Sequence, residues 1–198
     1  MLVDRCLDGE QAAARELFRR QRGRVQASLY RILGSNRDMD DLLQETFIQV
    51  FRSLGSFRGE SRLATWIDRI AVRAAYRHLS RSRNQLTPVP LDIVDASASG
   101  DVPGVGAEPA GRRAEPFGQT VAREGVRRLY AALAQLPAKG RIAFALHAID
   151  GRPVAEVARL VAASETATKL RIWRARRALE RIAADDPILR EFLREDAG

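Results

Sequence analysis

The sequence predicts an all-α protein: two small helical domains joined by a flexible linker, the second containing a helix-turn-helix. Apolar residues recur at helical spacing on both sides of the chain's centre, and no alternating pattern competes as a strand. Five of the eight prolines fall in one central stretch, residues 85–122. These observations place the domains at residues 1–84 and 123–198, with the linker between them.

Charge follows the same division. The 198 residues carry a formal net charge of +8, distributed as +6 over residues 1–84, −3 over 85–122 and +5 over 123–198. Two basic domains favour a polyanionic partner, either nucleic acid or an anionic membrane. Of the 33 basic residues 31 are arginine, a bias that GC-rich codon usage also explains, but codon usage does not account for the net charge.

Composition excludes several classes of protein. A single cysteine, Cys6, rules out an internal disulfide and a cysteine zinc cluster, and His78 and His147 lie too far apart in the sequence to suggest a ligand pair. We therefore expect no metal and no cofactor. Without a phosphate-binding glycine loop or a nucleophile–base pair, we expect no catalytic residue, no small-molecule substrate and no enzymatic activity. The chain has no apolar run long enough to insert into a membrane and no signal-peptide core, so we expect a cytoplasmic protein.

The first domain reads as three helices, at roughly residues 9–33, 38–54 and 61–82. Gly34 to Asn36 separates the first two, and the stretch from Gly55 to Gly59 separates the second from the third. One face of the second helix is apolar at intervals of four and three residues, which predicts that this face is buried. The residues on that face are Leu43, Phe47, Val50 and Leu54.

The linker, residues 85–122, is rich in proline and glycine and is predicted to contain no helix. Beyond it, a helix ends at Pro137 and another ends before the sequence Asp150-Gly-Arg-Pro153, a strong stop-and-restart signal. A short helix then begins at Val154. A turn ends at Ser164, which is a suitable N-cap for a long final helix.

A short helix, a tight turn and a long basic helix are typical of a helix-turn-helix, whose second helix enters the major groove. Its first turns would meet base edges, while arginines farther along would contact bases or phosphates. Because basic two-helix hairpins are common, the pattern alone does not establish DNA binding. The candidate contacts to bases are Glu165, Thr166, Lys169 and Leu170, those to bases or phosphates are Arg171 and Arg174, and those to phosphates or solvent are Arg177 and Arg181.

A second basic stripe lies on the third helix of the first domain, at Arg69, Arg73, Arg77 and Arg81. Like charges four residues apart repel each other, so the stripe requires a compensating partner. Arginines beside aromatic residues suit single-stranded nucleic acid, in which bases stack and phosphates pair. Trp66 nevertheless lies on the apolar face, which favours a core position.

The helix over residues 38–54 begins with a cluster of acidic residues, which helix-dipole compensation partly explains. Its outward face carries Asp41, Gln44, Glu45 and Ile48, and could dock a basic partner. Paired carboxylates could also bind Mg²⁺, but nothing else in the sequence supports that reading.

Three segments together resemble bacterial sigma-70-type factors of the extracytoplasmic-function group. Residues 38–51 (DMDDLLQETFIQVF) are similar to the helix that binds core RNA polymerase, and residues 56–71 (SFRGESRLATWIDRIA) resemble the promoter-melting segment. Residues 136–179, which include RARRAL at 174–179, resemble the second DNA-binding domain. The resemblance covers both domains in order, with the linker between them, and this ordered pair is highly specific.

The resemblance implies a role for each segment. The first domain would dock on the β′ clamp helices of polymerase and melt the −10 element, and the second would read duplex DNA at −35. It implies polymerase contacts at Asp41, Leu42, Gln44, Glu45 and Phe47; −10 contacts at Phe57, Arg58, Gly59, Glu60, Ser61, Arg62, Thr65, Trp66, Arg69, Arg73, Tyr76 and Arg77; and −35 contacts at Ser164, Glu165, Thr166, Lys169, Leu170, Arg171, Trp173, Arg174 and Arg177.

The sequence departs from the family pattern in several places. Ala162 stands where the family usually has glycine, and the recognition helix opens Glu165-Thr-Ala-Thr168 rather than Val-Gly-Thr-Val. A left-handed alanine would cost about 1–2 kcal/mol. The altered opening of the recognition helix puts the preferred −35 sequence in question. Asp68 stands where the family often has a hydrophobic or aromatic residue and Arg73 where it often has an asparagine, which puts the preferred −10 sequence in question.

The resemblance implies an alternative sigma factor that binds core RNA polymerase (the β′ clamp helices and the β subunit) and promoter DNA, joins the nucleoid within the holoenzyme, and is restrained by an anti-sigma factor. Two other readings stay open. A stand-alone repressor or activator would leave the acidic helix and the melting loop without a purpose. A degenerate sigma-like protein that titrates an inhibitor is supported only by the altered segment 162–168.

Overall fold

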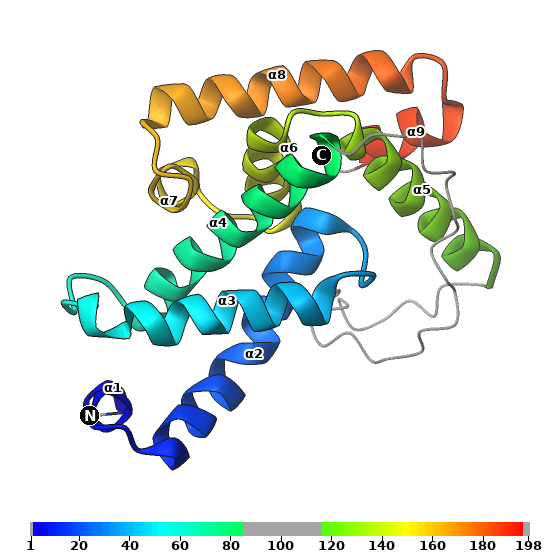
Figure 1. Ribbon diagram of the computed structural model, residues 1–198. Helices are drawn as coiled ribbons and strands as arrows, with labels where there is room; N and C mark the ends of the chain where they lie inside the picture. The colour runs from blue at the N-terminus through cyan, green and yellow to red at the C-terminus, as the bar shows by residue number, and fades with distance from the viewer. Residues whose placement is uncertain (1, 85–115, 196–198) are drawn as a thin grey trace.

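The computed structural model describes residues 2–84 and 116–195, and within these ranges every regular element is helical (Figure 1). This confirms the predicted all-α class. The elements are α1 (Leu2–Leu7), α2 (Gln11–Leu33), α3 (Met39–Ser53), the 3-10 turn η1 (Leu54–Ser56), α4 (Leu63–Asn84), α5 (Pro116–Ala134), α6 (Ala138–Phe144), the π-helical turn η2 (Ala145–Ile149), α7 (Val154–Leu160), α8 (Glu165–Ala183) and α9 (Pro187–Glu195).

Helices α2, α3 and α4 pack together as the first half of the molecule. The predicted inner face of α3 is buried, with Leu43, Phe47 and Val50 each at most 3% exposed. The predicted helix over 9–33 is α2, and a short helix that was not predicted, α1, precedes it. The chain turns between the two at Gly9, whose φ of +83° suits glycine. Helix α2 ends at Gly34, also left-handed, whose amide donates to Tyr30 O at 2.6 Å.

The second half contains α5 to α9, and two of its helices differ from the prediction. Helix α5 starts at Pro116, inside the predicted linker, so the expectation that 85–122 holds no helix is wrong for its last residues. Proline fits the first turn of a helix, where its missing amide hydrogen is not needed. Helix α9 was not predicted. It begins after Asp186, whose Oδ1 accepts from Leu189 N at 3.1 Å as a cap.

Helices α7 and α8, with the turn between them, form the predicted helix-turn-helix. The Ser164 side chain accepts from Ala167 N at 3.2 Å, which confirms its role as the N-cap of α8. In the turn, Ala162 has a φ of +50°, the only left-handed residue other than glycine in the described part of the chain. The backbone position that usually takes glycine is therefore held here by alanine.

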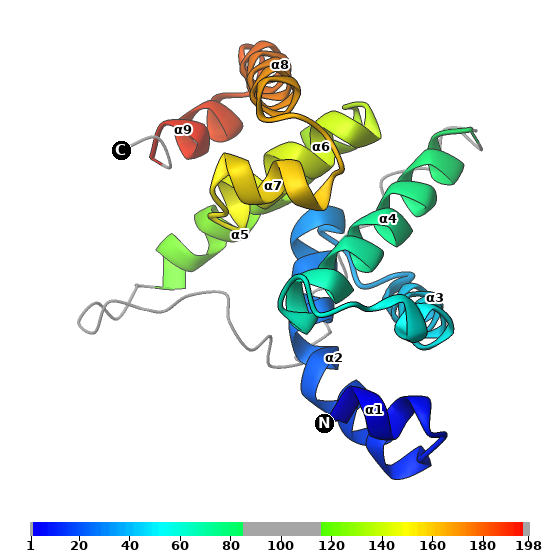
Figure 2. The same cartoon turned by 90° about the vertical axis from the view of Figure 1, so that its left-hand side faces the viewer.

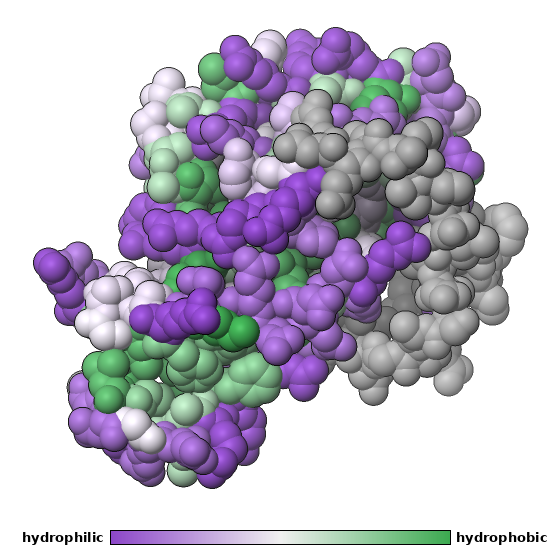
Figure 3. Space-filling view, in the orientation of Figure 1, coloured by the Kyte–Doolittle hydropathy of each residue, from purple (hydrophilic) through white to green (hydrophobic). Residues whose placement is uncertain are grey.

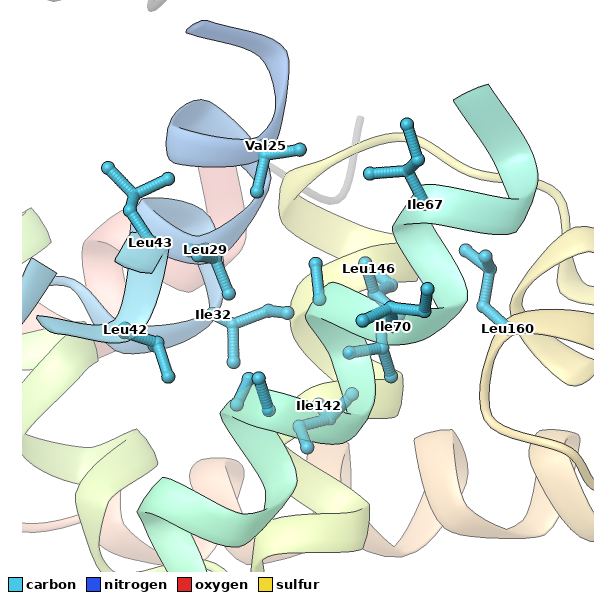
Figure 4. Packing of buried hydrophobic residues seen from close by; sticks show 14 of the residues in the cluster. Val25, Leu29, Ile32, Leu42, Leu43, Ile67, Ile70, Ile142, Leu146 and Leu160 are labelled. Atoms are coloured by element: carbon cyan, nitrogen blue, oxygen red, sulfur yellow. The ribbon is translucent and has the colours of Figure 1, made fainter. Parts of the chain in front are cut away.

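The two halves lie against each other, and α4 faces both α6 and α7 (Figures 1 and 2). One continuous apolar cluster contains Ile32 and Ile67 from the first half together with Ile142 and Leu160 from the second (Figure 4). A second cluster, formed around Leu133, Phe144 and Leu179, belongs to the second half alone. No helix among the described residues is long and apolar enough to cross a membrane.

Candidate nucleic-acid interface

Helix α8 divides sharply into two faces. Thr168, Ile172 and Leu179 are buried against the rest of the second half. The opposite face is polar and basic, and in Figure 3 it forms part of the hydrophilic surface along the top of the molecule. Of the residues predicted to contact −35 DNA, Arg171 is half-buried, and the others are exposed: Ser164, Glu165, Thr166, Lys169, Leu170, Trp173, Arg174 and Arg177.

Two large apolar side chains stand on this exposed face. Leu170 is 43% exposed and Trp173 is 56% exposed. The Arg177 guanidinium lies 5.8 Å from the centre of the Trp173 ring, a cation–π arrangement. An exposed basic helix with apolar groups among its cations can contact phosphates and thymine methyl groups together.

Helix α4 carries the predicted arginine stripe. Arg73 and Tyr76 are exposed, and Arg69 is half-buried. One member of the stripe has a compensating partner in Glu45 of α3, which accepts from Arg77 Nη2 at 2.9 Å. A predicted polymerase contact and a predicted −10 contact are therefore paired with each other.

The loop before α4 presents most of the remaining predicted −10 residues. Phe57 and Trp66 are both half-buried, and their ring centres lie 5.5 Å apart. Trp66 packs against the core, as its position on the apolar face predicts, although part of it stays accessible. Arg58, Gly59, Glu60 and Arg62 are exposed, and Ser61 and Thr65 are half-buried.

On α3, the predicted polymerase contacts differ in accessibility. Asp41 and Gln44 are exposed and Glu45 is half-buried, but Leu42 is only 2% exposed. Leu42 lies on the inner face of the helix and so helps to position α3 rather than to present a contact. Phe47 is 3% exposed, and its ring lines a shallow groove of about 280 Å³.

The groove adds residues that the predicted polymerase site lacks. Ile48 and Phe51 are 41% and 36% exposed, and both line the groove beside Phe18 and Arg22 of α2. Figure 3 shows apolar surface over this part of α3. The signal in the sequence was Ile48 itself, an apolar residue on the polar face of its helix.

The described residues contain no group of three histidine, cysteine, aspartate or glutamate side chains that could hold a metal ion. His147 Nδ1 lies 2.8 Å from Arg152 O at the end of η2, and His78 Nε2 lies 3.5 Å from Asp38 Oδ2. Both histidines thus sit in local contacts at helix surfaces or boundaries.

Comparison with known proteins follows the same two-part division. Residues 17–85 match Sigma-70 region 2, and residues 126–179 match Sigma-70, region 4. The chain is 31% identical over 183 residues to the ECF RNA polymerase sigma-E factor of Escherichia coli strain K12, covering 91% of each chain. It is 30% identical over 179 residues to the same factor of Haemophilus influenzae, covering 90% of this chain and 92% of the relative.

Two solved structures of similar fold also match most of the chain. CnrH, solved in complex with the cytosolic domain of CnrY, has a TM-score of 0.58 and 25% identity, with 93% of this chain and 96% of that chain covered. The sigma factor RpoE of Bartonella quintana, solved with the anti-sigma factor NepR, shares the fold at a TM-score of 0.53 and 20% identity, with 87% and 97% covered.

The chain therefore belongs to the ECF group of sigma-70 RNA polymerase sigma factors. An ECF sigma factor directs promoter-specific transcription initiation through regions 2 and 4, and it is an initiation factor rather than a catalyst. Sigma factors bind core RNA polymerase and promoter DNA. The family and function that the sequence resemblance implied are thereby confirmed.

Proposed function

We propose that this chain divides its work among three surfaces: α3 docks on the β′ clamp helices of polymerase, the 57–62 loop with α4 opens the −10 element, and α8 reads −35 DNA. The functional domains are residues 1–84 and 123–198, with 85–122 as the connecting segment. The observation that carries the proposal is the exposed basic face of α8, behind a capped helix-turn-helix.

The docking surface is the groove on α3. Ile48 and Phe51 expose apolar area that a partner helix could bury, and Arg22, Asp40 and Gln44 add polar groups to the lining. Apolar anchors surrounded by polar residues are typical of helix-in-groove recognition. Asp40 and Arg22 carry opposite charges, and their arrangement would fix the orientation of a partner helix.

In this proposal, the loop at residues 57–62 and helix α4 open the −10 element. A base extruded from the duplex loses a few kcal/mol of stacking, which an aromatic surface and hydrogen bonds can offset. The Phe57–Trp66 pair, with ring centres 5.5 Å apart, and the exposed Tyr76 offer such surfaces. Arg58, Arg62 and Arg73, all exposed, would hold the phosphates of the separated strand.

The resemblance to CnrH, which was solved in complex with CnrY, supports an anti-sigma partner for this chain as well. An inhibitor that covers the α3 groove would compete directly with polymerase. Its binding should therefore weaken with the same groove substitution that weakens polymerase binding.

The docking proposal is tested with Ile48→Asp, which places a charge in the groove. We expect core polymerase affinity to fall at least about tenfold, because a central apolar anchor is lost and a charge would need desolvation. Val126→Asp is the matched control, since Val126 is 40% exposed, against 41% for Ile48, but lies on α5. Equal affinities for the two variants in fluorescence anisotropy would refute the assignment of the groove.

A further inference from the structure

A small pocket lies where α4 of the first half faces α6 and the helix-turn-helix of the second half (Figures 1 and 2). Its volume is about 220 Å³. Its floor is apolar and buried, since Val72, Ile142 and Leu160 are each at most 4% exposed. The other lining residues are more accessible, and we call them the rim: Arg73, Tyr76, Lys139, Val161, Ala162 and Arg171. The pocket thus combines a closed apolar floor with an accessible and mostly polar rim.

Three cations of the rim meet at this pocket, and each comes from a different helix: Arg73 from α4, Lys139 from α6 and Arg171 from α8. Among the residues that the structure describes, none of the three forms an ion pair with a carboxylate. Arg77, one turn farther along α4, is by contrast paired with Glu45. Like charges that line one small pocket repel one another, so a bound anion would relieve a repulsion that the described residues leave uncompensated.

An aromatic ring stands beside these cations. Tyr76 is 39% exposed, and the Lys139 ammonium lies 6.0 Å from the centre of its ring. A ligand whose anionic groups pair with the cations could therefore also place a flat ring against Tyr76. Stacking on an aromatic side chain stabilises any nucleobase, because every base has a π face. The rim thus offers partners for both parts of a nucleotide, the phosphates and the base.

We propose that this pocket binds a free nucleoside phosphate, with the base beside Tyr76 over the apolar floor and the phosphates paired with the three cations of the rim. Arginine matches phosphate oxygens with two parallel hydrogen bonds, and lysine adds a point charge. The pocket is smaller than the range of about 300–1,000 Å³ that drug-sized ligands fill. It therefore suits a single base whose phosphates extend to the open rim.

Lys139 distinguishes this site from the surfaces that would bind promoter DNA. Arg73 and Tyr76 belong to the predicted −10 contacts and Arg171 to the predicted −35 contacts, whereas Lys139 belongs to neither set. Its side chain is exposed on α6, so its substitution should leave the fold intact. The nucleotide site therefore stands or falls independently of the proposed roles of α4 and α8 at the promoter.

The test is isothermal titration calorimetry of the full chain with ATP, inorganic triphosphate and adenosine, at about 150 mM salt so that long-range attraction is screened. We expect ATP to bind at least about fivefold more tightly than triphosphate, because only ATP adds stacking. Adenosine, which lacks the anionic groups, should bind more weakly than either.

Two variants separate the parts of the site. Lys139→Gln should weaken ATP and triphosphate alike, by about fivefold, because both lose one charge contact at an accessible site. Tyr76→Leu should lower the affinity for ATP to that for triphosphate and leave the affinity for triphosphate unchanged, because only the base contacts the ring. Circular dichroism checks that each variant is folded, and Lys139→Gln carries the test if Tyr76→Leu is not.

Arg159→Gln is the matched control, because it removes one exposed cation of α7, next to Leu160 in the sequence but outside the pocket lining. It should bind ATP as wild type does. The proposal is overturned if wild type does not bind ATP, if triphosphate binds as tightly as ATP, or if Lys139→Gln and Arg159→Gln weaken ATP binding equally. A Lys139→Gln variant that loses affinity only for a single-stranded oligonucleotide of about ten nucleotides would assign the pocket to DNA and overturn the proposal as well.

Discussion

At the scale of single residues, Tyr130 shows how the contact between the halves depends on a neutral group. Burial raises the pKa of Tyr130 to about 12, and Tyr30 adds to the shift. The protonated phenol donates to Arg31 O, whereas a phenolate could not. The folded state therefore binds this proton more tightly than the unfolded chain does.

Stability should accordingly fall at high pH. The contribution of Tyr130 is fully present below pH 10, its unfolded pKa, and is lost as pH rises to about 12. Over that range we expect a loss of about 2–3 kcal/mol in the free energy of unfolding. Urea titrations of wild type and Tyr130→Phe measure it, and the variant should decline less steeply. Parallel curves for the two proteins would show that Tyr130 is not the titrating group.

Ala162 holds a conformation that alanine disfavours, with φ at +50°. Ala162→Gly should relieve about 1–2 kcal/mol of strain. Because glycine also gives the unfolded chain more freedom, we expect a net gain of about 0.5–1 kcal/mol. The neighbouring Ala163→Gly should instead lower stability. Urea unfolding compares the two, and a loss at both positions would contradict the strain argument.

At the scale of elements, α8 is the helix that the sequence predicted best. Ser164 is a good N-cap, and Thr168, Ile172 and Leu179 follow helical spacing. The start of α8 and its buried face could therefore both be predicted from the sequence. The remaining residues of the helix were therefore predicted to form its exposed face. Local capping and periodicity carry this information, and tertiary contacts did not overrule them.

Arg174→Ala tests the role of that exposed face. We expect a loss of about 1–3 kcal/mol in binding to promoter DNA if Arg174 pairs with a base, together with weaker discrimination at one −35 position. Arg190→Ala is the control, an exposed arginine on α9 outside the predicted site. If both variants lose affinity uniformly across sequences, Arg174 contributes only charge.

Other elements were harder to predict. Helix α9 was not predicted, although Pro187 and the cap at Asp186 mark its start. Pro116 lies close to the prolines of the predicted linker in the sequence, but in the structure it opens α5. For Pro116, the sequence alone does not distinguish a proline that begins a helix from one that prevents a helix. On α3, the resemblance implied a contact role for Leu42, whereas the structure buries this side chain.

At the scale of the whole molecule, the sequence predicted two basic domains but not their association. Asp68 forms an ion pair with Arg152, 84 residues away in the chain, and Arg31 forms one with Asp150, 119 residues away. No local periodicity encodes such pairings. The one hint was Asp68, a carboxylate where the family usually has an apolar residue, on a face otherwise buried. Its partner became identifiable only when the halves were placed together.

The central claim is that this chain directs polymerase to a promoter that α8 recognises. The most direct measurement is run-off transcription by purified core polymerase, on a template chosen by mapping RNA 5′ ends after the protein is overproduced. We expect a transcript that requires the protein and is lost when the −35 bases are changed. A transcript that is absent, or indifferent to the −35 sequence, would contradict it.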